Sequence, residues 1–273
     1  MQLFQLLPDA ILPDEEQLQD HYQDPVSYTH LDVYKRQKYN LRLKSELQRA
    51  TKGLFMKTIK IKNSSKEITI GKIVCVGRNY AEHVHELGNV IHEKPVVFLK
   101  TVSSVIYSGD EIVYPSFSND MHHETELVLL IGEDIKDADS ETAERAIAGY
   151  GIGLDMTLRD AQSDLKKKGH PWTIAKCFDT STVLSDFVEK SSHHLTLDET
   201  ISLKINGEYR QKDQLNKMLH KPVEIVQYIS SLMKLEAGDL IFTGTPKGVS
   251  KVVSGDKLEA ELEGILKLEC KVR

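Results

Sequence analysis

Cysteine is scarce in this chain of 273 residues: Cys75, Cys177 and Cys270 lie far apart, and no CxxC pair occurs. Neither a disulfide framework nor a sulfur-ligated zinc site is therefore expected, and such cysteine usage is typical of a reducing compartment. Long apolar runs are also missing, because no stretch approaches the roughly 18 residues that a membrane-spanning helix needs. The chain begins without the basic start and small-residue cleavage site of a secretion signal. Together these absences predict a cytoplasmic protein that is not anchored in a membrane.

Positive charge is not in excess either. The 35 lysines and arginines stand against 41 aspartates and glutamates, which gives a net charge of -6 at pH 7. An acidic chain with charges of both signs interspersed is a poor partner for nucleic acid or an anionic membrane surface, so neither is expected. The net charge does not exclude small anionic ligands, because an acidic chain can still contain a local basic pocket. The hydrophobic content of 40% is enough for a proper core.

Residues 1–55 differ in character from the rest of the chain. They are polar and rich in Gln and Asp, whereas strand-like alternation begins at Met56. Residues 25–37 resemble a translated sequencing-adapter fragment that recurs at the ends of unrelated predicted proteins. We therefore expect residues 1–55 to be an artefactual or disordered extension and residues 56–273 to be one domain. The alternative is a real extension, with an amphipathic helix at 41–54 that packs on the body or on a partner.

Short strands are expected to dominate the body of the protein. Alternation and apolar runs between turn residues predict strands at 73–77, 95–99, 111–114, 239–243 and 257–272. Asn206-Gly207 predicts a two-residue hairpin turn, since both positions favour positive φ. Helices are expected from Ser140 as N-cap towards Gly149, at 158–168, and from Pro222 onward. Without an internal repeat, the pattern indicates an α+β fold in which β-structure dominates.

Glu124 and Glu126 are the first candidates for a functional site. Side chains two residues apart in a strand point the same way, so both carboxylates share one face while Thr125 points away. The apolar run at 127–131 behind them predicts a buried strand. Carboxylates at the end of a buried strand need a counter-charge. A divalent cation would supply that charge, with Asp155 as a third oxygen ligand. Two solvated glutamates on an edge strand are the alternative.

His83 and Glu86 lie three residues apart, so that on a helical turn their side chains are neighbours. A carboxylate beside an imidazole can hold and polarise a water, but an ordinary exposed helix face has the same spacing. Lys176 follows a strand-like run at 172–175, where a lysine can also simply reach solvent. These residues alone leave both interpretations open.

Five segments occur in one order along the chain: residues 76–86, 122–127, 154–160, 171–176 and 243–249. Together they resemble the fumarylacetoacetate hydrolase family, and within it the branch of acylpyruvate hydrolases and oxaloacetate decarboxylases. The resemblance extends over about residues 73–273, and five ordered motifs are far more specific than any single one. It implies a mixed β-sandwich or β-roll with a few peripheral helices, and a homodimer.

The resemblance also implies roles for individual residues. Three metal ligands are implied: Glu124, Glu126 and Asp155. Their all-oxygen ligation suits Mg²⁺, which we rank first, or Mn²⁺. Three catalytic residues are implied, a water-activating pair and a lysine that stabilises the developing enolate: His83, Glu86 and Lys176. Five substrate-binding positions are implied: Arg78, Arg159, Gln162, Gly244 and Thr245.

Several of these positions have an alternative interpretation. Ion pairs with Asp160 or Glu82 would account for the two arginines, and an ordinary glycine-proline turn would account for residues 244–246. His122 has the same strand parity as the two glutamates, so it is either an added ligand or, as we expect, a hydrogen-bond partner around the site. After Lys100 the family continues with proline, whereas Thr101 follows here, so we expect the pocket wall beyond Lys100 to differ.

The activity that the resemblance implies is Mg²⁺-dependent cleavage of a C–C bond in a small 2-oxo acid, through a metal-bound enolate. Acylpyruvates such as fumarylpyruvate or acetylpyruvate are the expected substrates. Decarboxylation of oxaloacetate, or isomerisation or decarboxylation of 2-hydroxyhepta-2,4-diene-1,7-dioate, would use the same enolate. A catalytically silent protein that binds metal and oxo acid on the same scaffold is the alternative from a different class.

Overall fold

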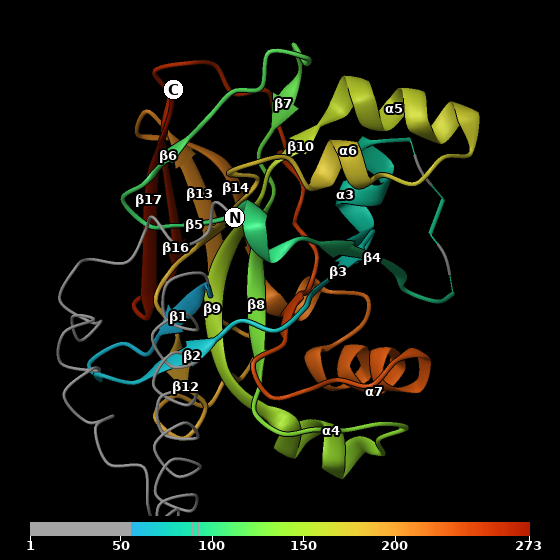
Figure 1. The fold of residues 1–273 in the computed structure, drawn as a ribbon, viewed down its shortest axis with the longest axis vertical. Helices are drawn as coiled ribbons and strands as arrows, with labels where there is room; N and C mark the ends of the chain where they lie inside the picture. Colours follow the sequence, from blue (N-terminus) through green and yellow to red (C-terminus); the bar gives the residue numbers. More distant parts are fainter. Residues whose placement is uncertain (1–55, 89, 92) are drawn as a thin grey trace, which may run out of the picture. The chain divides into compact units, whose positions relative to one another are not determined.

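A computed structural model of the protein describes residues 56–273 apart from residues 89 and 92. The predictions for residues 1–55 lie outside the described residues. Within the described part, a mixed sheet and an antiparallel-rich second sheet account for most of the regular secondary structure, and short helices lie around them (Figure 1). This β-dominated architecture agrees with the α+β class expected from the sequence.

The larger sheet has eight strands. Their order is β4 (Val96–Lys100), β3 (Ile73–Gly77), β15 (Leu240–Phe242), β8 (Thr125–Ile131), β9 (Ile147–Asp155), β11 (Thr182–Leu184) and β5 (Val105–Tyr107), with β12 (Val188–Glu189) also paired to β9. Parallel pairing joins β3 to β15 and β5 to β11, and the other neighbours are antiparallel. Strands far apart in the sequence therefore meet at the centre of this sheet.

The second sheet has five strands, in the order β14 (Glu208–Gln214), β13 (Thr200–Ile205), β16 (Lys257–Leu262), β17 (Leu266–Val272) and β6 (Glu111–Ile112). Two small antiparallel pairs complete the β-structure: β1 (Thr58–Lys60) with β2 (Glu67–Thr69), and β7 (Met121–His122) with β10 (Thr157–Leu158). The described helices are α3 (Ala81–Glu86), α4 (Ser140–Ala146), α5 (Arg159–Lys168), α6 (Thr173–Lys176) and α7 (Pro222–Leu232), with 3-10 turns at Val102–Ser104 and Leu215–Lys217.

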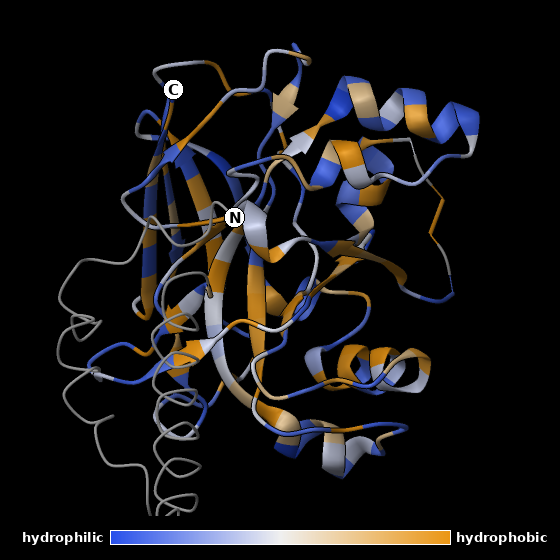
Figure 2. Ribbon diagram, viewed as in Figure 1, coloured by the Kyte–Doolittle hydropathy of each residue, from blue (hydrophilic) through white to orange (hydrophobic). Residues whose placement is uncertain are grey.

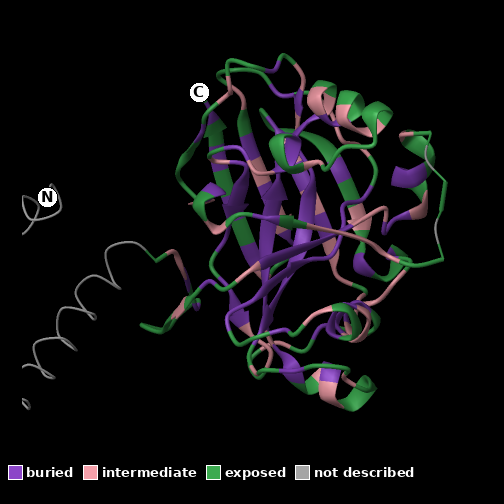
Figure 3. Ribbon diagram, turned by 45° about the vertical axis from the view of Figure 1, so that its right-hand side comes forward, coloured by how far each residue is buried: buried purple, intermediate pink, exposed green. Residues whose placement is uncertain are grey.

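Strand β8 is buried on both faces, which explains why its sequence is a continuous apolar run. Leu127 and Leu129 belong to a large core that also contains residues of β13 and β16 from the second sheet. Val128 and Leu130 belong to a second core that contains Phe187 and Phe242. Figure 3 shows the strands as the most buried part of the described chain, and Figure 2 shows the contrast between the apolar strands and the largely hydrophilic α5. The predicted buried strand is confirmed.

Strand β9 carries glycine at 149, 151 and 153, on the face that continues to Asp155. A Cβ at Gly151 would lie 2.6 Å from the ring of Phe187, and one at Gly153 would lie 2.3 Å from the ring of Phe242. Since such contacts are far shorter than van der Waals distance, these glycines make room for the two large rings of the second core. The strand that ends at Asp155 is therefore held in place by close packing.

Several elements match the prediction. Helix α5 ends at Lys168 and Gly169 follows with φ of 68°, as a helix-terminating glycine should. Asn206 and Gly207 both have positive φ between β13 and β14. Proline occupies the first turn of α7.

Three predictions at this level were wrong. Asp139, not Ser140, is the N-cap of α4, because its carboxylate accepts the N–H of Thr142 at 2.8 Å. That helix stops at Ala146, since the chain then joins the sheet as β9, in which Gly149 is a strand residue. The strand-like run at 172–175 forms the short helix α6, because its backbone bonds are local: the N–H groups of Ala175 and Lys176 both donate to the carbonyl of Trp172.

No helix among the described residues is long and apolar enough to cross a membrane.

Candidate active site

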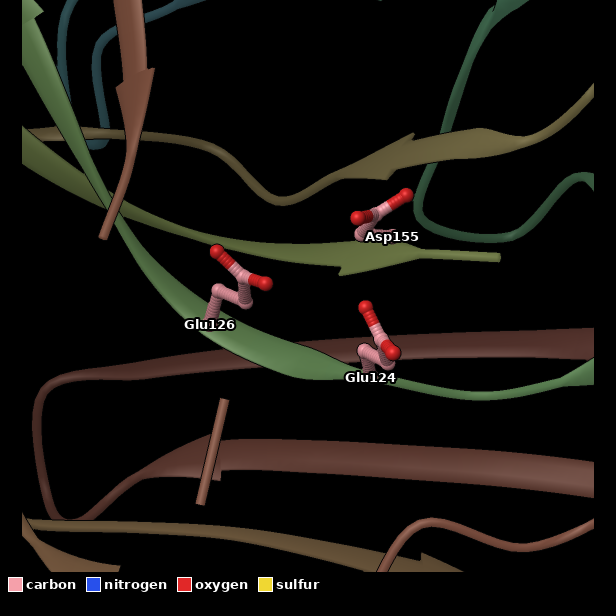
Figure 4. Close-up of side chains that lie close together, drawn as sticks. All are labelled: Glu124, Glu126 and Asp155. Carbon is pink, nitrogen blue, oxygen red and sulfur yellow. The ribbon is translucent and has the colours of Figure 1, made fainter. Parts of the chain in front are cut away.

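Three carboxylates meet at the end of strands β8 and β9. One ligand oxygen each from Glu124, Glu126 and Asp155 lies within 4.8 Å of the others, and Figure 4 shows the three side chains facing a common space. Glu126 lies opposite Gly153 across the two strands, and the carbonyl of Glu124 accepts the N–H of Asp155 at 2.8 Å. The residues are only 5%, 3% and 0% exposed. The predicted acidic cluster is thus formed, and it is buried rather than solvated.

Cations from three other elements contact this cluster. Lys176 Nζ donates to Glu124 Oε2 at 2.7 Å and to Asp155 Oδ2 at 2.5 Å. Lys100 Nζ, at the end of β4, donates to Asp155 Oδ1 at 2.8 Å and to the carbonyl oxygen of Lys176. The guanidinium of Arg159 donates to Glu124. Glu124 and Asp155 are therefore paired with cations of the protein, whereas Glu126 contacts none of these three.

The environment separates the pKa values of the two glutamates. Burial, with the charges of Asp155 and Glu124, raises the pKa of Glu126 well above its ordinary value. Burial acts on Glu124 in the same direction, but the charges of Lys176 and Arg159 prevail and hold its pKa well below the ordinary value. Burial opposes the charged form of Lys176, yet Asp155 and Glu124 raise its pKa, so Lys176 is an ammonium at neutral pH.

The donor set fits a hard divalent cation. Carboxylate oxygens are the ligands that Mg²⁺ and Mn²⁺ prefer, and these ions leave coordination positions open for water or substrate oxygens. Among the described residues, Glu126 has no ion-pair partner, and its carboxylate accepts one hydrogen bond, from the N–H of Gly244 at 2.7 Å. The carboxylate of Glu126 is therefore available to bind a cation other than the protein's own lysines and arginine.

His83 and Glu86 form a pair on helix α3. Their Nδ1 and Oε2 atoms are 3.2 Å apart, as the three-residue spacing predicts. Glu86 also accepts the N–H of Gly248 at 3.0 Å, which ties α3 to the loop after β15. Burial lowers the pKa of His83 below its ordinary value, so the imidazole is neutral at pH 7. A neutral ring that donates Nδ1–H to Glu86 leaves Nε2 free of a proton, as a general base requires.

A pocket of about 40 Å³ brings most of the candidates together. Its wall includes the following predicted residues: Arg78, His83, Glu124, Glu126, Arg159, Gln162, Lys176 and Thr245. Asp155 and Gly244 are not part of that wall, but each contacts a residue of it: Asp155 accepts from Lys176, and the N–H of Gly244 donates to Glu126. Glu86 reaches the pocket only through His83. Phe98 and Trp172 add aromatic surface.

Helix α5 presents two of the predicted substrate-binding side chains. Arg159 Nη1 donates to Gln162 Oε1 at 2.9 Å, and both residues line the pocket. The alternative pairing of Arg159 with Asp160 is wrong, because Asp160 accepts from Ser118 Oγ at 2.7 Å and from the N–H of Asn119 at 2.9 Å. Glu82, the alternative partner for Arg78, lies 2.6 Å from Lys247.

The loop after β15 supplies Gly244 and Thr245. Gly244 has φ of 98°, which favours glycine, and a Cβ there would meet Asn79 at 2.7 Å. The Thr245 hydroxyl donates to the carbonyl of Thr125 at 2.8 Å and accepts from Gln211 Nε2 at 2.7 Å. Its proton is therefore used within the protein, and only a lone pair is left for a ligand.

His122 takes neither of its predicted roles. Its Nε2 lies 3.0 Å from Asp120 Oδ1, and its Nδ1 has no hydrogen-bond partner among the described residues. The acidic cluster does not include it. The reason is local: β7 ends at His122 and pairs with β10, and β8 begins only at Thr125, so the strand parity that links residue 122 to residue 124 is interrupted.

Sequence reasoning missed a buried polar network behind the cluster. His123 Nδ1 donates to Gln211 Oε1 at 2.9 Å, and Ser250 Oγ lies 2.9 Å from His123 Nε2. Burial lowers the pKa of His123 to about 4, so it is neutral. Gln211 lies on β14 of the second sheet and holds Thr245 from there. No sequence signal connects positions that are 88 residues apart.

Comparison with known proteins places this geometry in a family. Residues 72–273 match the family described as fumarylacetoacetate (FAA) hydrolase C-terminal. The chain belongs to the fumarylacetoacetate hydrolase family. This confirms the resemblance that the five ordered motifs indicated.

Members of the fumarylacetoacetate hydrolase family with related sequences include oxaloacetate tautomerases. The chain is 43% identical over 198 residues to oxaloacetate tautomerase YcgM of Escherichia coli, which covers 71% of this chain and 90% of that protein. It is 42% identical over 204 residues to the mitochondrial oxaloacetate tautomerase FAHD1 of Bos taurus, covering 73% and 90%. At such identity the fold is shared.

A solved structure of the family has the same fold. The fumarylpyruvate hydrolase of Pseudomonas aeruginosa, in complex with Mn²⁺ and pyruvate, aligns with a TM-score of 0.77 at 35% identity, covering 80% of this chain and 95% of that one. The fold class expected from the sequence is thereby confirmed. A metal ion in that relative and the buried acidic cluster here both indicate binding of a divalent metal.

Proposed function

We propose that the protein is a metal-dependent hydrolase that cleaves the C–C bond of a small acylpyruvate. The main support is one juxtaposition: the neutral His83, held by Glu86, lines the same pocket as the acidic cluster and Lys176. A site for binding alone would need the cluster and the cations, but not a general base. Mg²⁺ is the metal we rank first, with Mn²⁺ as the alternative.

The bound cation would polarise the keto and carboxylate oxygens of the 2-oxo acid and stabilise the negative charge that develops on them. His83 would accept a proton from a water that attacks the distal carbonyl, and Glu86 would stabilise the resulting imidazolium. The C–C bond then breaks, which releases a carboxylic acid and leaves the electron pair on pyruvate as its enolate. Proton return from His83 to that carbon gives pyruvate.

Lys176 stabilises the developing enolate in this proposal. Its ammonium lies between Glu124 and Asp155, so a small reorientation would turn one N–H towards an enolate oxygen. Lys100 would keep Asp155 and the backbone of Lys176 in place, because its ammonium contacts both. Arg159 and Gln162, linked to each other on α5, would orient substrate oxygens. The loop with Gly244 and Thr245 would close the opposite wall.

A second candidate is interconversion of the enol and keto forms of oxaloacetate. It is favoured by the 43% identity with an oxaloacetate tautomerase over most of that protein's length. The same site would serve, with His83 moving a proton at carbon and no attack by water. Decarboxylation of oxaloacetate and isomerisation of a longer oxo-dienedioate would also use the same groups.

Turnover of a substrate panel tests the proposal. Acetylpyruvate, fumarylpyruvate and oxaloacetate are offered to the full chain with Mg²⁺, with Mn²⁺ and with a chelator, and pyruvate formation and the enol absorbance are followed. We expect metal-dependent cleavage of an acylpyruvate, which the Glu124→Ala, Glu126→Ala double variant lowers by at least about 100-fold.

Glu82→Gln is the control, since this exposed carboxylate lies beside His83 on α3 but outside the cluster. It should leave the rate within about twofold of the unchanged chain. Full activity of the double variant would overturn the metal mechanism. Interconversion of oxaloacetate tautomers without cleavage of any acylpyruvate would favour the second candidate.

The expected partner is therefore a small 2-oxo acid. The homodimer and the cytoplasmic location expected from the sequence stay predictions.

A further inference from the structure

Lys166 is a pocket residue to which the proposed reaction assigns no task. It lies on α5, four residues after Gln162 and seven after Arg159, so the three side chains share one face of the helix. All three line the pocket. Lys166 is only partly buried, whereas the carboxylates of the cluster are buried. It therefore stands at the outer part of the pocket, one helical turn beyond Gln162.

Aromatic packing holds Lys166 in this position. Its Nζ lies 5.3 Å from the centroid of the Trp172 ring, within the range of a cation–π contact. Trp172 in turn packs against Phe98, with ring centroids 5.8 Å apart and an interplanar angle of 59°. Both aromatic residues line the same pocket. The ammonium is thus placed in advance, which lowers the entropy cost of binding an anion there.

The charge of Lys166 is not matched within the described residues. Lys100, Lys176 and Arg159 each contact a carboxylate of the cluster, but no ion pair between described residues involves Lys166. Burial, together with the positive charges of Arg78 and Arg159, lowers its pKa. Cations from the end of β3 and from α5 therefore repel one another at this end of the pocket, and an anionic ligand would relieve that repulsion.

We propose that Lys166 binds the far carboxylate of a dicarboxylic 2-oxo acid and so makes the enzyme prefer dicarboxylic over monocarboxylic substrates. This inference rests on the proposed function, because the acidic cluster must hold the 2-oxo end of the substrate at the inner end of the pocket. The far end of a four- to seven-carbon acid then reaches the outer end, where Lys166 stands. Oxaloacetate and fumarylpyruvate carry a carboxylate there, and acetylpyruvate carries a methyl group.

Substrate preference of three variants of the full chain tests the inference. Lys166→Met keeps an unbranched side chain against Trp172 but removes the charge, and Lys166→Arg keeps the charge. Lys167→Met is the matched control, since Lys167 is exposed on the same helical turn. We expect Lys166→Met to raise KM about tenfold for fumarylpyruvate and oxaloacetate, with kcat little changed. For acetylpyruvate, KM should stay within about twofold.

The other variants complete the pattern. Lys166→Arg should restore most of the affinity for the dicarboxylic substrates, and Lys167→Met should behave like the unchanged chain. If Lys166→Met raised KM equally for acetylpyruvate and fumarylpyruvate, the inference would be overturned, because the substitution would then have a general effect on the pocket. An unchanged KM for both substrates would overturn it as well.

A binding measurement keeps this inference separate from the proposed function. The pair 2-oxoglutarate and 2-oxopentanoate differs only by a far carboxylate against a methyl group, and titration calorimetry in the presence of Mn²⁺ needs no turnover. We expect 2-oxoglutarate to bind about tenfold more tightly, and the difference to vanish in Lys166→Met. Equal affinities in the unchanged chain would overturn the inference. Absence of turnover on every 2-oxo acid, with this preference intact, would overturn the proposed function alone.

Discussion

At the scale of single residues, chemically identical groups in the pocket have different surroundings and therefore different pKa values. Glu124 and Glu126 are two residues apart, yet the cations beside the first lower its pKa, whereas burial and two carboxylates raise the pKa of the second. His83 is kept neutral by burial, although Glu86 touches it. These differences decide which group holds a proton at pH 7, and therefore which can accept one.

The lowered pKa of His83 predicts the acid limb of the pH–rate profile, which is the pH range in which activity falls as the solution becomes more acidic. In the proposed reaction neutral His83 is the base, so the rate of acylpyruvate cleavage should be steady from pH 8 to about pH 6.5. It should fall only as the pH drops through the lowered pKa, where the imidazole becomes charged. The same sign holds for stability: the folded state prefers the neutral ring, so this contribution is present above the ordinary pKa and is lost at acidic pH.

A profile of kcat/KM against pH measures this. The limb should disappear in His83→Gln, whose residual rate should be lower by about 10²–10⁴-fold. Glu82→Gln should keep the limb where it is. A limb centred above pH 6.5 in the unchanged chain would contradict the assignment of His83 as a base kept neutral by burial.

At the scale of elements, strand β9 links the second core to the acidic cluster. Gly151 and Gly153 accept the rings of Phe187 and Phe242, and the next residue on that face is Asp155. Because a strand shifts as a unit, the packing of these rings sets where the carboxylate of Asp155 lies. The stability of the core and the geometry of the cluster are therefore coupled through this strand.

Replacement of Gly153 by valine should be strongly destabilising. The new Cβ would lie 2.3 Å from the ring of Phe242 and 2.8 Å from Val128, and overpacking of this kind costs about 1–3 kcal/mol. A chain of this size should then melt a few degrees lower, by about 2–4 °C per kcal/mol. Calorimetry measures both quantities.

The double variant Gly153→Val, Phe242→Leu is the informative control. Leucine lacks the ring that the new side chain would strike, so the combined loss of stability should be smaller than the sum of the two single losses. Simple additivity would show that the clash is not the cause.

At the scale of the whole molecule, the two sheets bring together segments that span most of the described chain. The pocket wall takes residues from Val76 near one end to Thr245 near the other. Residues Met56–Arg273 form one unit by their contacts, and the family match covers residues 72–273. All the described residues of the proposed site therefore lie after Met56.

A chain shortened to residues 56–273 should accordingly fold and act like the full one. Its melting temperature should stay within a few degrees, and kcat/KM for the preferred acylpyruvate within about twofold, since no described site residue is removed. Thermal unfolding and turnover measured side by side check this. Failure of the shortened chain to fold, or a loss of activity, would show that residues 1–55 belong to the functional protein.

Local physics explains what the sequence by itself determined. The spacing of His83 and Glu86, the glycine after α5, the Asn-Gly turn and the apolar run of β8 each depend on neighbouring residues, and each was predicted correctly. The acidic cluster of Glu124, Glu126 and Asp155 needed more, because no local spacing relates residue 155 to the other two, and the likeness of five ordered segments to a family supported it as the third ligand. The α4 cap and the helix at 173–176 were missed, since adjacent residues offer several competing local bonds.

Only the tertiary structure decided the partners of the buried polar groups. Lys100 contacts Asp155 across 55 positions, and Gln211 joins His123 to Thr245 from the other sheet. Lys166 is a pocket residue because the ring of Trp172 holds it there. Such contacts carry no periodic signal, since they depend on which strands lie side by side rather than on the residues next in the chain. The sequence determined which side chains are available for chemistry, and the packing of the two sheets decided which of them meet.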